Sequence, residues 1–290
     1  MKRSLRWLLA ATLVAVGILG SRTQADEGLR AGVDLLFLSP KLSSTGIGNV
    51  FYGQGVGAID AASGSISGSE LDFAQRLIIG YEGDQGGGVQ VRWFTFDNQV
   101  GYNGEVDHET DGLVSLTGFL NLDVDALDAE FTQRGEFNVW DWVATAGARY
   151  ARVSIREDIS DPGMDIDWES FSDTVWFGST GVQFEGAGPT VSVEGSRPIF
   201  TDEISFFGRA RTSLLYGEVE QFSAWRAGGG IIIPDEFVQV WEVQAGLQME
   251  REYDSFDWLL GIFWEAQRWD SQLLGDLAFH GFGINTGIEY

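Results

Sequence analysis

Cysteine is absent from the 290 residues, histidine occurs only twice, and proline occurs five times. Without cysteine the chain cannot form a disulfide, a thiolate nucleophile or a thiolate metal ligand. His108 and His280 are the only side chains whose ordinary pKa suits a base near neutral pH. Basic residues are also scarce, with 18 Lys and Arg against 43 Asp and Glu. Such an acidic chain lacks the electrostatic footprint of a nucleic-acid-binding protein, so we expect no nucleic-acid partner.

Long hydrophobic runs are also missing. The longest lies within residues 1–25, where a basic start (MKRSLRW) precedes a short apolar run (LLAATLVAVGILG) and small residues (SRTQA). The apolar run is shorter than the roughly 20 residues that a membrane-spanning helix needs. We therefore predict a secretory signal over residues 1–25 and one domain over residues 26–290. Removing the signal leaves 14 basic and 43 acidic residues, a formal charge of −29, and an exported chain of this kind can cross a membrane only as a barrel.

Glycine and aromatic residues are abundant instead, with 39 Gly, 20 Phe and 11 Trp. This mixture favours strands and tight turns over helices. Alternation of period two predicts about ten strands. They cover residues 29–39, 71–82, 89–98, 113–133, 139–155, 179–196, 203–218, 237–252, 255–269 and 279–290. Most exceed the five or six residues usual in soluble sheets.

The connections alternate in length. Short ones fall near Asp84, Gly135, Phe200 and Asp254, and the longer ones cover residues 40–70, 99–112, 156–178, 218–236 and 271–276. Short turns at one end and long loops at the other are typical of an all-β, antiparallel, up-and-down outer-membrane barrel with periplasmic turns and extracellular loops. Pro189 interrupts one strand, because proline cannot donate a ladder hydrogen bond. If the strand breaks there, the count becomes 12.

The faces of the predicted strands separate into apolar and polar sets. In residues 237–252, for example, Trp241, Val243 and Ala245 alternate with Glu242 and Gln244. A soluble β-sandwich shows the same alternation, so the pattern alone leaves both folds open. In a barrel, such a face would line a polar lumen in which neighbouring strands can pair opposite charges. The residues that we expect to face the lumen are Arg76, Arg92, Arg149, Arg209, Arg211, Glu194, Glu242 and Glu265.

Tryptophans gather near the strand ends. Trp140, Trp142 and Trp258 lie beside short turns, while Trp241 and Trp269 lie toward the long loops. Two such groups are expected where a barrel meets the two membrane interfaces. Together with the charged polar face and the export signal, they favour the barrel over the sandwich.

Four segments resemble a known family. RAGVDLLFLSPKLS, FEGAGPTVSVEGSRPI, SFFGRARTSLLYGE and the closing FHGFGINTGIEY are similar to the Legionella-type pore-forming major outer membrane proteins of Gram-negative-type bacteria. The resemblance implies an outer-membrane β-barrel, porin-like in function. It also implies that Phe282 and Tyr290 form a C-terminal signal read by the barrel assembly machinery. The implied partners are outer-membrane lipid, this machinery and small solutes or ions, and a homo-oligomer is left open.

Catalytic and metal-binding alternatives rest on weak patterns. His108 lies between Asp107 and Asp111, and His280 could combine with Ser271 or Ser255, but no G-x-S-x-G nucleophile motif is present. A solvated loop and an interface position explain the two histidines better, so we predict that the chain is not an enzyme. The acidic segment DISDPGMDIDWE offers oxygen ligands without the spacing of an EF-hand. It favours a solvated loop, and we predict no metal and no cofactor.

The strand number limits the expected function. About eight strands enclose an interior filled by side chains, and 16 to 18 leave a wide channel. Ten strands with five lumenal arginines predict at most a narrow, charge-lined or gated pore for small solutes or ions, and the acidic balance predicts cation preference. We expect a structural role in the outer membrane beside it. Two alternatives remain: a non-conducting barrel acting as an adhesin or surface-binding protein through its loops, and a barrel hydrolase dependent on His108 or His280.

Overall fold

The computed structural model describes residues 28–43, 66–67, 71–83, 85–108, 112–160, 178–201, 203–223, 231–271, 273 and 275–290. The predicted signal, residues 1–25, lies outside these ranges, as do residues 44–65 and residues 161–169 of the acidic segment. Among the described residues there is no helix long and apolar enough to cross a membrane.

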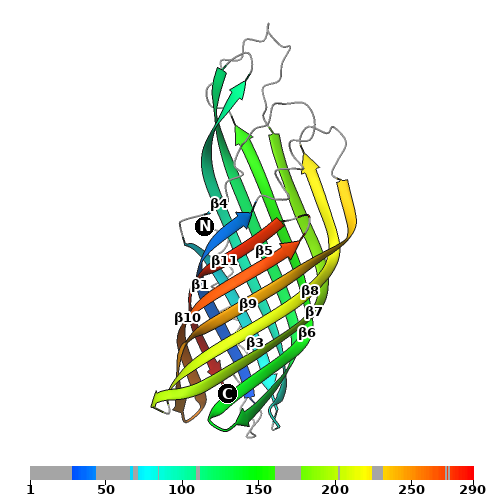
Figure 1. Cartoon of the computed structure of the whole chain (residues 1–290). Helices are drawn as coiled ribbons and strands as arrows, with labels where there is room; N and C mark the ends of the chain where they lie inside the picture. The colour runs from blue at the N-terminus through cyan, green and yellow to red at the C-terminus, as the bar shows by residue number, and fades with distance from the viewer. Residues whose placement is uncertain are drawn as a thin grey trace.

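Strands make up all the regular structure that is described (Figure 1). They are β1 (Gly28–Ser43), β2 (Ile66–Ser67), β3 (Asp72–Glu82), β4 (Gly87–His108), β5 (Gly112–Phe137), β6 (Trp140–Ser160), β7 (Gly178–Thr201), β8 (Ile204–Ser223), β9 (Ile231–Tyr253), β10 (Phe256–Ser271) and β11 (Gly275–Glu289). Each long strand pairs antiparallel with its neighbours in sequence, and β2 is a two-residue addition to β1. The prediction of an all-β, up-and-down arrangement is confirmed.

The sheet closes because β1 pairs with β11. Their register runs from Arg30 opposite Glu289 to Ser43 opposite Asp276. At the end of this seam the backbones of Leu29 and Tyr290 exchange two hydrogen bonds, of 3.2 and 3.1 Å. Ten long strands therefore form a closed barrel, and a closed barrel has no unpaired edge.

Short turns lie at one end of the barrel and longer connections at the other, as predicted. In the β5–β6 turn Asn138 adopts a left-handed conformation with φ 59°, which asparagine tolerates better than most residues. One expected loop is different. Residues 99–112 mostly continue β4 into a hairpin with β5, in which His108 pairs with Gly112. Period two continues in the sequence there, since Val100, Tyr102 and Val106 alternate with polar residues such as Asn103 and Glu105.

Pro189 does not break its strand. Strand β7 pairs with β6 through Pro189, which lies opposite Ala148, and only the pairing with β8 omits Gly188 and Pro189. A Cβ on Gly188 would lie 1.9 Å from the carbonyl oxygen of Leu214, so the two backbones approach closely at this irregularity. The alternative count of 12 strands is therefore wrong.

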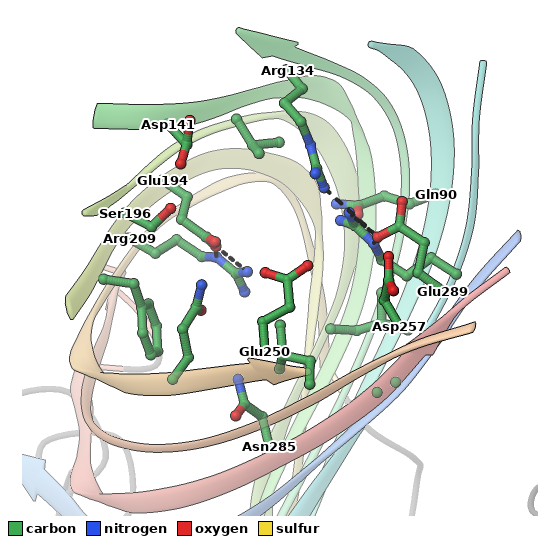
Figure 2. A pocket seen from close by; sticks show the side chains of 18 of the residues that line it. Gln90, Arg134, Asp141, Glu194, Ser196, Arg209, Glu250, Asp257, Asn285 and Glu289 are labelled. Atoms are coloured by element: carbon green, nitrogen blue, oxygen red, sulfur yellow. Dashed lines mark hydrogen bonds and ion pairs between the residues drawn. The ribbon is translucent and has the colours of Figure 1, made fainter. Parts of the chain in front are cut away.

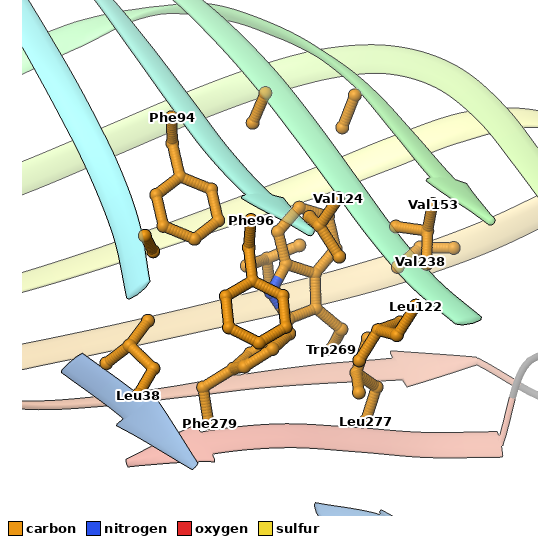
Figure 3. Packing of buried hydrophobic residues seen from close by; sticks show 14 of the residues in the cluster. Leu38, Phe94, Phe96, Leu122, Val124, Val153, Val238, Trp269, Leu277 and Phe279 are labelled. Carbon is orange, nitrogen blue, oxygen red and sulfur yellow. The ribbon is translucent and has the colours of Figure 1, made fainter. Parts of the chain in front are cut away.

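The two faces of the barrel exchange their polarity along its axis. Toward the short turns, β5 points Leu127 and Phe131 outward and Asp128 inward, while toward the long connections it points Asp125 outward and Val124 inward. The inward apolar residues pack together in the lumen (Figure 3). The short-turn half thus has the polarity of a membrane barrel, and the other half has that of a water-soluble one.

Candidate functional site in the barrel lumen

Nine buried charged residues form a layer across the lumen, here called the charge layer. They are Asp34, Arg76, Arg92, Asp128, Glu130, Arg149, Arg211, Glu242 and Glu265, all at most 5% exposed. Their contacts join strands from opposite walls: Arg92 Nη2 of β4 donates to Glu242 Oε2 of β9 at 2.6 Å. Such a contact requires both side chains to point into the lumen. Of the eight residues expected there, Arg76, Arg92, Arg149, Arg211, Glu242 and Glu265 belong to this layer.

Arg76 connects the strands on both sides of the seam. Its Nη1 donates to Asp34 Oδ2 of β1 at 2.8 Å, and its Nη2 donates to Glu265 Oε1 of β10 at 2.6 Å. Gln244 and Gln267 donate further hydrogen bonds to Glu265, at 2.6 and 2.5 Å. Buried charges are tolerated when they are paired and hydrogen-bonded in this way, and they become costly when a partner is lost.

The remaining arginines surround Asp128 and Glu242. Arg149 binds Asp128 through Nε and Nη2, at 2.6 and 2.9 Å, and its Nη1 lies 2.6 Å from Glu242 Oε1. Arg211 forms an ion pair with Glu130 and donates to Asp128 Oδ2 at 3.3 Å. Because these pairs connect β5, β6, β8 and β9, they hold several parts of the wall in fixed relative positions.

An apolar layer lies next to the charge layer, on the side of the long connections. Its members are Leu36, Leu38, Phe94, Phe96, Leu122, Val124, Val153, Val238, Val240, Trp269, Leu277 and Phe279, all at most 5% exposed. Phe96 and Phe279 meet edge to face at a centroid distance of 5.0 Å (Figure 3). The guanidinium of Arg76 lies 5.5 Å from the ring centroid of Phe94, where the two layers touch.

Trp269 corrects one prediction. It was expected at the membrane interface, but it is 1% exposed inside the apolar layer (Figure 3), and its Nε1 donates to Gln267 Oε1 at 3.3 Å. The strand alternation explains this position, because Trp269 has the same phase as Glu265 and Gln267. Its nearness to a strand end was a weaker signal than its phase.

The other predicted aromatic residues lie on the outer face. Trp140 and Trp241 are 39% and 48% exposed, and Trp142 and Trp258 have the same outward phase on their strands. Trp258 Nε1 donates to Thr286 Oγ1 at 3.1 Å. On β11 Phe282 is 61% exposed on this face. Tyr290 follows the end of β11, 43% exposed, with its ring 5.8 Å from that of Phe256.

A cavity of ≈ 750 Å³ occupies the short-turn end of the lumen, below the charge layer, and is here called the vestibule (Figure 2). Arg209 and Glu194, the other two predicted lumenal charges, form an ion pair in its wall. At its edge Arg30 of β1 forms ion pairs with Glu289 at 2.8 Å and Glu82 at 3.4 Å.

Several residues of the vestibule and of the charge layer were not predicted from the sequence. Asp34 stands alone in an apolar strand, and its partner Arg76 is 42 residues away, so only the registered barrel brings them together. The same holds for Arg30 and Glu289, 259 residues apart. Glu250, by contrast, has the phase of Glu242, so the alternation of residues 237–252 already assigns it to the polar face.

The described residues do not assemble the suggested catalytic groups. His280 lies on the outward phase of β11, whereas Ser271 is buried on the inward phase of β10, where its Oγ donates to Glu236 Oε1 at 2.5 Å. The side chain of His108 and all of Asp111 lie outside the described residues. Within the described ranges no group of three or more His, Asp or Glu residues is arranged to hold a metal ion.

A closed barrel with an apolar outer band and a charged lumen defines a membrane barrel of the outer-membrane class. The family model described as Legionella pneumophila major outer membrane protein precursor matches residues 23–269. The chain belongs to this family and is an outer-membrane protein, as the resemblance of its strands predicted. Its short turns therefore face the periplasm and its long connections face the exterior. No curated protein matches the chain.

Three solved structures illustrate the similarity to other outer-membrane proteins. The outer membrane protease OmpT of Escherichia coli is 12% identical, with a TM-score of 0.48, over 93% of this chain and 99% of that chain. A major outer membrane protein of Thermus thermophilus is 10% identical, with a TM-score of 0.37, over 92% and 100%. The toluene transporter TodX of Pseudomonas putida is 12% identical, with a TM-score of 0.33, over 92% and 75%.

Proposed function

We propose that this protein is a non-conducting outer-membrane barrel that supports the membrane and presents an extracellular extension for surface contacts. The observation that carries this proposal is the double closure of the lumen. Side chains that line a water-filled pore are accessible to water. Here Glu265 of the charge layer and Val124 and Val240 of the apolar layer are all 0% exposed.

The strand lengths support the surface role. A membrane-spanning strand needs roughly 9 to 11 residues, whereas β4 through β9 have 20 to 26 residues each. The excess lies on the side of the long connections, where the outer face carries charges such as Asp123, Asp125 and Arg152. This part of the wall has the polarity suited to water and extends outward from the membrane.

A narrow, cation-preferring pore is the second candidate function. Its support is the vestibule, where seven acidic residues and four arginines line a cavity open to the ions of the periplasm. Such an excess of one charge attracts counter-ions. Permeation would require the charge layer and the apolar layer to move aside, since both cross the lumen.

Planar-bilayer conductance of the refolded mature chain separates the two functions. The protein is first shown to be folded by its heat-dependent migration on a gel, and a 16-stranded porin serves as the positive control for the bilayer. We expect folded protein to insert without discrete current steps. Steps with cation-selective reversal potentials would replace our proposal by the second candidate, and anion-selective steps would contradict both.

A hydrolase activity must also be considered, since the outer-membrane class includes hydrolases. We propose that this chain is not one of them, because His280 and Ser271 lie on opposite faces of the wall. If a hydrolase activity were found and were lost on His108→Ala alone, this part of the proposal would be wrong.

A further inference from the structure

The vestibule has acidic side chains that the closure of the barrel does not explain. Four of its seven acidic residues, Glu136, Asp141, Glu250 and Asp257, form no ion pair within the described part of the chain. They lie within a few residues of the periplasmic ends of β5, β6, β9 and β10. Figure 2 shows Glu250 pointing into the cavity, with Arg209 and Glu289 on either side. The periplasmic end of the cavity therefore offers uncompensated carboxylates.

The inner end of the same cavity has the opposite character. Arg92 lines it from deeper along β4, and its side chain is 2% exposed. Only Nη2 has a hydrogen-bond acceptor among the described residues, Glu242 at 2.6 Å, while Nε and Nη1 have none. Asp128 Oδ2 forms a longer ion pair with Nη1, at 3.6 Å, which leaves that nitrogen without a hydrogen bond. A buried donor without an acceptor is costly, so this guanidinium can gain an anionic partner.

We propose that the vestibule binds a small zwitterion whose carboxylate and ammonium groups are several bonds apart, as in a short peptide. The carboxylate reaches Arg92 at the inner end, and the ammonium group lies among Glu250 and Asp257 nearer the periplasm. Charge-assisted hydrogen bonds of both signs then replace the missing partners. A volume of ≈ 750 Å³ lies within the range of small-molecule sites.

The arrangement of charges also selects against simpler ligands. A dicarboxylate would have to pass, and then remain beside, the unpaired carboxylates of Glu250 and Asp257. A diamine would satisfy those carboxylates but would place a second cation next to Arg92. Only a ligand with one charge of each sign, in this order, avoids both repulsions.

Triglycine is a suitable probe, because its two ends can be blocked one at a time. Isothermal titration of the folded, detergent-solubilised mature chain would compare triglycine with its N-acetyl form and its C-terminal amide. We expect triglycine to bind. Each blocked form should bind at least about tenfold more weakly, because it loses one charge-assisted hydrogen bond. An amide that binds as well as triglycine would show that Arg92 is not used, and the absence of triglycine binding would overturn the proposal.

Two substitutions test the contacts from the protein side. Glu250→Gln should weaken triglycine binding at least about tenfold while leaving the amount of folded barrel unchanged. Glu203→Gln, the same change at an exposed turn residue outside the cavity, should have no effect. Arg92→Gln should remove the preference for triglycine over its amide. If Glu250→Gln and Glu203→Gln bind triglycine equally, the site is elsewhere, whatever the bilayer measurement gives.

Discussion

Arg76 shows what a single buried charge contributes to this barrel. Its guanidinium lies between Asp34 and Glu265, and the side chains of Arg76 and Glu265 are 0% exposed. Two effects oppose each other at such a site, since burial removes hydration from each charge while pairing restores interaction energy. The pair as a whole can be close to neutral for stability, but the loss of one member leaves its partners buried without compensation.

Replacing Arg76 therefore has a definite expected result. Arg76→Met leaves the carboxylates of Asp34 and Glu265 unpaired, and we expect a loss of about 3–5 kcal/mol in the free energy of unfolding. The measurement is the temperature at which the folded band disappears from a detergent gel. Adding Glu265→Gln to Arg76→Met should restore part of the loss, because it removes one uncompensated charge.

An exposed arginine provides the matched control. Arg268 on the outer face of β10 forms ion pairs with Asp270 and Asp276, and its side chain is 56% exposed. Solvent screens such pairs, so Arg268→Met should change stability by less than about 1 kcal/mol. If the Arg76 and Arg268 variants lost folded protein at the same temperature, the charge layer would not stabilise the barrel as argued.

Within a single long strand, the polarity of the inner and outer faces changes along the length of the strand. In LNLDVDALDAEF, residues 120–131, the apolar residues occupy even positions up to Ala126 and odd positions from Leu127 onward. The backbone keeps its period of two, so the inward phase is unchanged. The surroundings change instead, from water to lipid on the outside and from apolar to charged packing on the inside.

The strands and their faces could be predicted from the sequence, whereas the packing inside the lumen could not. Strand number, turn positions and the inward phase of residues such as Arg76 follow from alternation, which depends only on local backbone geometry. The closed lumen does not follow from it, because alternation is the same in a water-filled barrel and a packed one. The Asp34–Arg76 contact depends on the register between strands of the barrel. For Trp269, the position near a strand end predicted the membrane interface, whereas the phase of the strand correctly indicates the lumen.

Introduced cysteines can locate the membrane boundary on β5, since the natural chain has none. We expect Asp125→Cys, on the outer face beyond the polarity change, to react with a membrane-impermeant maleimide on intact cells. Phe131→Cys, at a site that is 73% exposed outside the barrel, should be protected by lipid and should react only after solubilisation. Equal labelling of both on intact cells would place the boundary elsewhere.

Closure of the barrel depends on the pairing of the first and last long strands, β1 and β11. The β1–β11 register, the paired backbones of Leu29 and Tyr290, and the contacts of Arg30 with Glu289 all lie along this seam. The Tyr290 side chain contributes less to the closed state, because it is 43% exposed and its ring contact is with Phe256 at 5.8 Å. Its side chain and its backbone thus have separable roles.

Substitution of Tyr290 should therefore affect assembly more than stability. Tyr290→Ala keeps both backbone hydrogen bonds with Leu29, so the refolded barrel should unfold within a few degrees of the natural chain. If the barrel assembly machinery reads the terminal aromatic side chain, the same variant should accumulate less in the outer membrane of cells, and Tyr290→Phe should accumulate normally. Pulse labelling followed by membrane fractionation measures this rate. Normal assembly of Tyr290→Ala would show that the aromatic ring is not the signal, and a large loss of stability in vitro would show that its ring contact with Phe256 is needed to close the barrel.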